Sequence, residues 1–553
     1  MLRMLALCLT AVLAACSSRP APAETARPPN VIIILADDLA YSDLAPYGGE
    51  INTPNIARLA ASGVTFDRFF TAPMCSPSRA MLMTGVAAQR TGYGAMAEFL
   101  APTQQGQPGY EGYLNDRVAT MAEVLAAQGY QTAISGKWHL GQQALAHERG
   151  FQQSFILVQG AGSHFDASGY GPGQPTVDYL RDGEPTALPD DFYSSDFYAD
   201  QMIEYWNARD PDEPFFGYLA FSAPHWPLHA PEEDIARYED RYRAGYEVLR
   251  AERVARMIEL GFIPPGTPVP DRLAFVPAWD SLTPEEQAYT AREMAVYAAM
   301  VDRMDQAIGR LLDVIEASGQ RDNTIIIFSS DNGPEAIDFY TRPVIPPILD
   351  WMNENFDQSI EALGSARSYP FYGAGWALAG AGPHRYFKTY VTMGGMHVPF
   401  IMSWPGGGLP QGARISASAT MMDVAPTIYA AANAPAALPG RIAPDGASML
   451  PLVRGQADTL AREGAGFELF GHETLIDGHW KLMRLRPPEG NGEWALYDMR
   501  SDPGELNDVS AVYPDVAERL RARYEEWGAD VGLIRAPDDY RILWTDPPAH
   551  HDH

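Results

Sequence analysis

The stretch NVIIILADD, residues 30–38, decides the fold. Its apolar part, Val31 to Leu35, is a continuous run dominated by β-branched residues. Such a run is typical of a strand buried on both faces of a parallel sheet. Two carboxylates, Asp37 and Asp38, follow directly. Because ligands collect at the carboxyl ends of strands in doubly wound sheets, the stretch predicts a polar site at one sheet edge.

A second run of the same kind, TIIIF at 324–328, is followed by Asp331 and Asn332. Between the two runs lie helical patterns, the clearest at 300–315, where apolar residues recur at spacings of three and four. That periodicity predicts an amphipathic helix that packs on the sheet. Together these segments predict an α/β architecture.

Two further predicted strands end in basic residues. The segment QTAIS at 131–135 leads to Lys137 and His139, and FFGYLAFS at 215–222 leads to His225. A single histidine beside a strand is more often structural than functional. Four strand ends that together carry carboxylates, a lysine and two histidines make a functional site the stronger interpretation.

Composition narrows the class of protein. The chain has 553 residues, 46% of them hydrophobic, and a formal net charge of −30. A folded protein with more than one domain is expected, and the acidic balance argues against nucleic acid as a partner. From about residue 460 the pattern changes to alternating strands and a closing amphipathic helix. We predict a catalytic domain at 30–455, a smaller α+β domain at 456–545 and a tail at 546–553.

The first 29 residues have the pattern of an export leader. A short apolar run ends in Leu-Ala-Ala-Cys at 13–16, which resembles a bacterial lipobox. We predict a lipoprotein-type signal peptide at 1–16, with a lipid on Cys16, and a Pro-rich tether at 17–29. An ordinary secretory signal is the alternative. Either one predicts an exported bacterial protein, periplasmic or anchored to the outer membrane, whose only membrane contact is this lipid.

Cys8 and Cys16 belong to the leader, so Cys75 cannot form an internal disulfide in the mature chain. It lies in TAPMCSPSRAMLMTG at 71–85, where Pro77 is suited to a first helical turn and Arg79 adds a cation. A helix N-terminus favours an anion and lowers a thiol pKa, so a thiolate nucleophile is one interpretation.

A second interpretation rests on family resemblance. CSPSR resembles the maturation signal of type I sulfatases, in which the cysteine is oxidised to Cα-formylglycine by a maturation enzyme, and Thr84-Gly85 continues that signature. Companion motifs run along nearly the whole chain: NVIIILADDLAYSD, SGKWHLG, APHWPLHAP, FSSDNG, FKTYVTMGGMHVPF and LYDMRSDPGELND. They look closest to bacterial arylsulfatases.

The resemblance implies the alkaline phosphatase-like fold: a large, mixed but mostly parallel sheet flanked by helices, plus a small C-terminal domain with an antiparallel sheet and helix. It also implies a divalent cation, Ca²⁺ with Mg²⁺ as the alternative. The residues alone agree, because hard oxygen ligands suit these ions. The implied metal ligands are Asp37, Asp38, Cys75 as formylglycine, Asp331 and Asn332.

The resemblance further implies a small-molecule sulfate ester as substrate and assigns roles to five basic residues. Arg79 and Lys137 hold the formylglycine oxygens, His139 takes a proton from its hydrate, and His225 and Lys388 assist the leaving oxygen. Together with Cys75, these five basic residues form the implied catalytic set.

The chain departs from the family in one place. The late motif usually reads Glu-Gly-Gly followed by Arg, whereas this chain has Met393 before the two glycines and His397 in place of the arginine. We expect Lys388 to keep its role as a sulfate ligand. The substitutions put its local support in doubt.

Three functions stay open at this point. The first is hydrolysis of sulfate monoesters, aryl sulfates foremost. The second is a formylglycine-dependent phosphonate monoester or phosphodiester hydrolase. The third is a non-enzymatic, calcium-binding surface lipoprotein with an unconverted cysteine. Trp226, Tyr372 and Trp376 are candidates for an apolar leaving-group pocket, although core packing explains each equally well.

Overall fold

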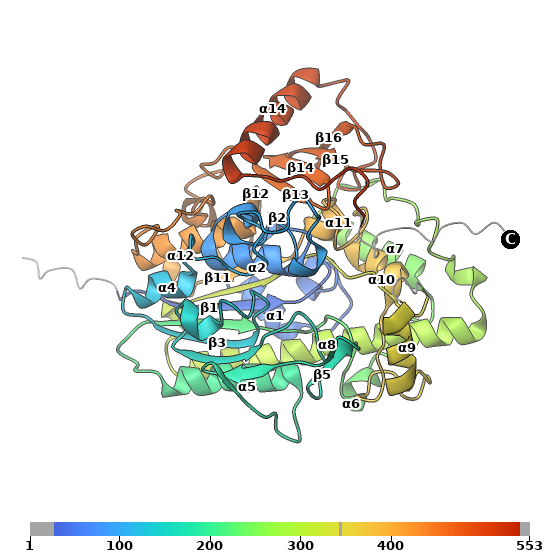
Figure 1. The fold of residues 1–553 in the computed structure, drawn as a ribbon, viewed down its shortest axis with the longest axis horizontal. Helices are drawn as coiled ribbons and strands as arrows, with labels where there is room; N and C mark the ends of the chain where they lie inside the picture. The colour runs from blue at the N-terminus through green and yellow to red at the C-terminus, as the bar shows by residue number, and fades with distance from the viewer. Residues whose placement is uncertain (1–26, 342–345, 542–553) are drawn as a thin grey trace, which may run out of the picture.

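The computed structural model describes residues 27–341 and 346–541. The predicted signal peptide, the lipid on Cys16, most of the tether and the tail lie outside the described residues. A large central sheet with helices on both faces forms the body, and a smaller unit packs on one side of it (Figure 1). No helix in the described ranges is both long and apolar enough to cross a membrane.

The central sheet has ten strands in the order β12-β2-β11-β10-β1-β9-β3-β4-β7-β8. Pairing is parallel from β10 through β1, β9 and β3 to β4, whereas β11 and β7 run antiparallel to their neighbours. The sheet is thus mixed but mostly parallel, which confirms the predicted fold class. Its strands are β1 (Asn30–Ala36), β2 (Val64–Phe70), β3 (Gln131–Lys137), β4 (Gln153–Leu157), β7 (Tyr179–Arg181), β8 (Glu184–Pro185), β9 (Phe215–Ala220), β10 (Thr324–Ser330), β11 (Phe400–Ser403) and β12 (Ala413–Thr420).

The two β-branched runs form the middle of this sheet. Every residue of β1 and β10 is buried, and the strands pair in register from Asn30 opposite Thr324 to Ala36 opposite Ser330. Side chains alternate between faces along a strand, so the isoleucines of each run contribute to two separate apolar layers. A continuous apolar run was therefore the correct signal for a strand covered on both sides.

Helices cover both faces of the sheet (Figure 1). The long helix α8 packs against α5 on one face, and α2, α4 and α12 contribute to the apolar layer on the other. The helices are α1 (Pro54–Ala61), α2 (Cys75–Thr84), α3 (Ala88–Thr91), α4 (Met121–Ala126), α5 (Ser194–Ala208), α6 (Glu232–Ile235), α7 (Tyr246–Glu259), α8 (Pro284–Ala317), α9 (Pro346–Asn355), α10 (Gly373–Ala381), α11 (Met393–Met396), α12 (Val424–Ala432), α13 (Leu450–Val453) and α14 (Pro514–Val531). Short 3₁₀ turns include η2 (Ala97–Phe99) and η7 (Met421–Asp423).

The amphipathic pattern at 300–315 lies within α8, as predicted, but the helix is much longer than the pattern. It begins with a capping box, in which the Thr283 side chain accepts from the Glu286 N–H and the Glu286 carboxylate accepts from the Thr283 N–H. Pro284 occupies the first turn, where its missing N–H is tolerated. These signals fix the start of the helix well before its buried face.

The C-terminal unit consists of an antiparallel sheet and one covering helix. Its strands are β13 (Ala465–Leu469), β14 (His472–Asp477), β15 (Trp480–Arg484) and β16 (Trp494–Asp498), in sequential order, and α14 packs on them. This agrees with the predicted antiparallel sheet and helix. The domain limits at 455 and 545 stay predictions.

Candidate active site

Four neighbouring parallel strands deliver polar side chains to one edge of the sheet. Asp37 and Asp38 follow β1 and Asp331 follows β10, while Lys137 ends β3 and His225 comes shortly after β9. These strands share one direction, so their carboxyl ends meet at the same edge. All five side chains are buried.

Cys75 is the first residue of α2, as its sequence context predicted. Its Sγ lies 3.5 Å from Asp37 Oδ1 and 3.7 Å from Asp38 Oδ1. Burial, reinforced by the negative charge of Asp331, raises the pKa of the Cys75 thiol well above its ordinary value. The expectation that the helix N-terminus lowers this pKa is therefore wrong, because desolvation and nearby carboxylates dominate.

Three buried ion pairs surround the cysteine. Lys137 Nζ lies 2.6 Å from Asp37 Oδ2, and Arg79 Nε lies 2.8 Å from Asp331 Oδ2. Burial raises the pKa of Asp37 to about 7, against the opposing effect of Lys137. In each pair the cation and the carboxylate compensate one another in a region that excludes water.

The third pair joins Lys388 Nζ to Asp38 Oδ2 at 2.9 Å. Burial acts to raise the pKa of Asp38, but Lys388, His225 and Lys137 together outweigh it and hold that pKa well below the ordinary value. Lys388 also lies 3.2 Å from Glu335, whose Oε1 accepts the backbone N–H groups of Ala336 and Ile337. Lys388 is thus fixed between two carboxylates.

The oxygen-rich cluster fits a hard divalent cation. Asp37, Asp38, Cys75 and His225 each offer a ligand atom, and these atoms lie within 4.8 Å of one another. Asn332 Oδ1 is buried and has no hydrogen-bond partner among the described residues. A buried acceptor without a donor is costly unless something positive faces it, which suits a cation.

Two of the predicted metal ligands differ in their surroundings. Asn332 donates through Nδ2 to Asp38 Oδ1 at 2.6 Å, which leaves its oxygen available. Asp331 is already engaged, because its Oδ1 accepts the Asp38 N–H at 3.1 Å and its Oδ2 faces Arg79. Both stay predicted ligands. His225, which the sequence analysis expected to assist the leaving oxygen, also lies in this cluster.

The two predicted histidines line the same cavity as Cys75. Burial lowers the pKa of both, with further lowering by Lys137 at His139. His225 donates through Nδ1 to the Trp226 carbonyl at 2.6 Å, and its Nε2 lies 3.5 Å from Asp38 Oδ2. His139 Nδ1 is buried without a hydrogen-bond partner in the described part of the chain, and its backbone is left-handed at φ 54°. Burial therefore favours the neutral form of both rings.

The departure at Met393 has a structural counterpart. The Met393 N–H, at the start of α11, donates to the Glu505 carboxylate at 3.1 and 3.2 Å. Glu505 comes from the C-terminal unit and forms a fully buried ion pair with Lys481. His397 stacks on Tyr41 with ring centroids 4.0 Å apart, outside the cavity. A carboxylate from the C-terminal unit thus supports the segment after Lys388.

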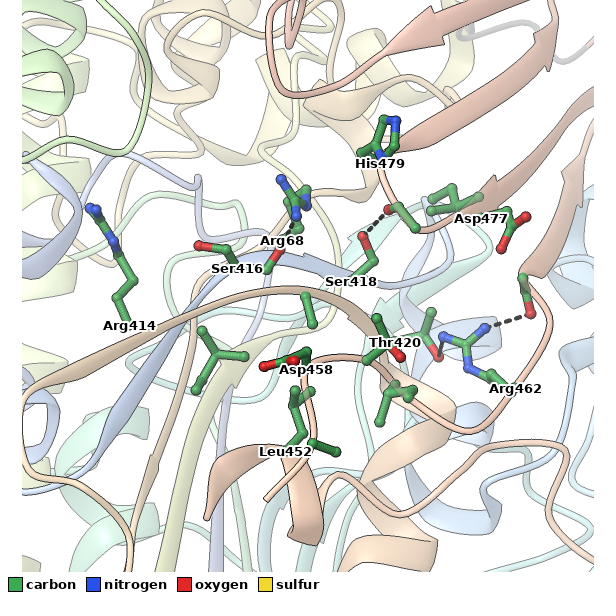
Figure 2. A pocket seen from close by; sticks show the side chains of 18 of the residues that line it. Arg68, Arg414, Ser416, Ser418, Thr420, Leu452, Asp458, Arg462, Asp477 and His479 are labelled. Atoms are coloured by element: carbon green, nitrogen blue, oxygen red, sulfur yellow. Dashed lines mark hydrogen bonds between the residues drawn. The ribbon is translucent and has the colours of Figure 1, made fainter. Parts of the chain in front are cut away.

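The cavity over Cys75 has a volume of about 220 Å³. Its walls are mostly apolar, formed by Met74, Met96, Phe99, Ala161, Tyr170, Trp226, Phe339 and Ile348. Of the three aromatic candidates, Trp226 lines this cavity, whereas Tyr372 stacks on Tyr297 and Trp376 packs in the core. A larger cavity of about 670 Å³ lies between β12 and the β14–β15 turn (Figure 2). The described residues that line it include none of the predicted site residues.

Sequence reasoning missed Glu335, Gly160 and Glu505. Glu335 had a signal, since it follows Asn332 by three residues in DNGPE. Gly160 had none: a Cβ there would lie 2.4 Å from the His139 ring, a contact that only folding creates.

Comparison with known proteins identifies the family. The sulfatase family model matches residues 29–434, and that of the N-sulphoglucosamine sulphohydrolase C-terminal region matches 382–529. The chain belongs to the sulfatase family. This sulfatase is 42% identical to an arylsulfatase of Klebsiella aerogenes over 72% of its own length and 86% of the relative's. It is 40% identical to an uncharacterised sulfatase of Schizosaccharomyces pombe over 93% and 95% of the two chains.

A solved structure, Ps i-CgsB bound to k-i-k-neocarrahexaose, shares the fold of this sulfatase. Its TM-score is 0.64 at 23% identity, with 92% of this chain and 95% of that chain covered. The family and its relatives establish that this sulfatase is an enzyme that hydrolyses sulfate esters.

Proposed function

We propose that this sulfatase cleaves aryl sulfates with a formylglycine derived from Cys75 and a bound Ca²⁺. The observation that carries the proposal is the position of Cys75. Its Sγ faces the oxygens of Asp37 and Asp38 in a cavity that also contains Lys388 and two histidines. An oxygen nucleophile at this position would lie between a cation and the sulfate-binding side chains.

The side chains that would hold the cation are Asp37, Asp38, Asp331 and Asn332, together with the oxygen that replaces Cys75 Sγ. The orphaned Oδ1 of Asn332 supports this set. A bound divalent cation would supply Lewis-acid polarisation of a sulfate oxygen and lower the pKa of the attacking hydroxyl. Oxygen ligands favour Ca²⁺ or Mg²⁺ over softer ions.

The basic residues act on the two ends of the ester. Arg79 and Lys137 hold the oxygens at position 75, since both lie beside it and are anchored by Asp331 and Asp37. Lys388 binds the sulfate and stabilises the negative charge that develops on the leaving oxygen. Donors fixed before the reaction stabilise such charge without reorganisation.

The histidines move protons. His139 is neutral and its Nδ1 has no partner among the described residues, so it can accept a proton from the hydroxyl at position 75. His225 is held through Nδ1 by the Trp226 carbonyl and lines the cavity, so it would assist the leaving oxygen when its Nε2 also carries a proton. Positioned acid–base groups of this kind contribute about 10²- to 10⁴-fold in rate.

The aryl preference rests on the apolar walls of the cavity and on the Klebsiella arylsulfatase relative. Trp226, Phe99 and Phe339 offer ring faces and edges to a flat leaving group. A volume of about 220 Å³ suits one small ring better than an extended chain.

Export and maturation complete the proposal. The leader supports a periplasmic or outer-membrane-anchored enzyme with a lipid on Cys16. The CSPSR motif supports a maturation enzyme that oxidises Cys75 by two electrons, replacing its sulfur with a carbonyl oxygen.

The test is Cys75→Ala. Turnover of 4-nitrophenyl sulfate should be lost while circular dichroism stays close to wild type and the four remaining side chains still bind the cation. Wild-type hydrolysis by the variant would exclude the nucleophile. A matured wild type that prefers phosphonate monoesters to sulfate esters would instead support the hydrolase alternative.

A further inference from the structure

One carboxylate in the substrate cavity has no cation beside it. Glu98, in η2, lines the same cavity as Cys75 and Lys388. It forms no ion pair with any residue that the structure describes. Glu335, the other carboxylate in the lining, is 3.2 Å from Lys388 and accepts two backbone N–H groups. Glu98 therefore contributes an uncompensated negative charge.

The surroundings of Glu98 solvate its charge poorly. Its neighbours in the lining include Met96, Phe99 and Tyr170, which offer little solvation. The side chain stays exposed at the cavity mouth, yet the protein around it is enough for burial to raise its pKa. Lys137, whose positive charge lowers the pKa of Glu98, is already paired with Asp37.

Such a carboxylate disfavours anionic ligands. Every substrate brings a negative sulfate, which the basic residues around Cys75 hold at the inner end of the cavity. A second negative charge on the leaving group would face Glu98 without compensation, whereas a positive charge would form an ion pair with it. Like-charge contacts discriminate between ligands as effectively as attractive ones.

Building on the proposed aryl specificity, we propose that Glu98 selects aryl sulfates whose leaving group carries a positively charged substituent, such as an ammonium group. An ion pair at a partly exposed position changes a rate constant by up to about fivefold. Repulsion between Glu98 and a carboxylate on the leaving group acts in the opposite direction. The kcat/KM values for the two charged leaving groups should therefore differ by roughly tenfold or more.

The experiment uses matured enzyme and three aryl sulfates with para substituents of similar size: 2-aminoethyl, propyl and 2-carboxyethyl. Two methylene groups separate the charge from the ring, so the phenols are similar leaving groups. We expect kcat/KM to fall in the order ammonium, neutral, carboxylate at low salt. Added NaCl should reduce the differences in kcat/KM among the three esters, because it screens exposed charges.

Glu98→Gln should make kcat/KM similar for the three esters. The values are compared as ratios within one enzyme preparation. The matched control is Glu233→Gln, which removes the same charge from an exposed position on α6 and should retain the order. Equal kcat/KM for all three esters in the wild type, or an unchanged order in Glu98→Gln, would overturn the inference. Failure to cleave even the neutral ester, by a matured enzyme that cleaves sugar sulfates, would instead overturn the proposed aryl specificity.

Discussion

Replacing Gly160 with alanine should displace His139. A Cβ at position 160 would lie 2.4 Å from both Cε1 and Nε2 of the His139 ring, whereas ordinary contacts begin at 3.4 Å. The ring must therefore move by about 1 Å, since it is the free end of a side chain and the surrounding backbone is packed. A displacement of that size can lower a catalytic rate about 10²-fold.

The assay is kcat for 4-nitrophenyl sulfate, normalised to the aldehyde content at position 75. We expect kcat to fall about 10²-fold, with little change in the free energy of unfolding. The matched control is Gly173→Ala, because a Cβ there meets no atom within 4 Å and the backbone is not left-handed. It should keep wild-type kcat.

A double-mutant cycle separates this effect from a general disturbance. In a His139→Ala background, Gly160→Ala should have no further effect, because the ring that it displaces is gone. A kcat for Gly160→Ala within threefold of the wild type would refute the reasoning, as would full additivity of the two substitutions.

Three further predictions concern the metal, the C-terminal unit and pH. Asn332→Ala should weaken Ca²⁺ binding, measured by titration calorimetry, and lower activity in parallel; unchanged affinity would remove Asn332 from the ligand set. Lys481→Met should destabilise the fold by about 3–5 kcal/mol in urea unfolding, since it leaves Glu505 buried without its cation, and Lys481→Met with Glu505→Gln should recover most of the loss. Burial raises the pKa of Glu468 to about 8 from its ordinary 4.5, so the folded state keeps a proton that the unfolded chain has lost. The free energy of unfolding should fall as pH rises through that window, and less so in Glu468→Gln; identical pH profiles would contradict this.

The sequence was informative where the signal is local. Two β-branched runs predicted β1 and β10, and the residues directly after them predicted the carboxylates of the site. Parallel strands place their carboxyl ends at one edge, so strand prediction alone brought these side chains together. Cys75 at the first turn of α2 followed from Pro77 in the same way.

What the sequence could not give are contacts between distant segments. Glu505 reaches the N–H of Met393 across 112 residues, and nothing near either residue indicates the partner. The raised pKa of the Cys75 thiol depends on burial and on Asp331, which outweigh the helix N-terminus. The apolar cavity wall combines side chains from several loops, so its lining emerged only with the fold.

The central claim is that the nucleophile derives from Cys75. The most direct measurement is peptide mass spectrometry across residue 75 on enzyme from a host able to mature sulfatases, with specific activity measured on the same preparations. The account predicts an aldehyde in place of the thiol, confirmed by a carbonyl reagent, and activity in proportion to the aldehyde fraction. Sulfatase activity in a preparation that contains only the Cys75 thiol would contradict it.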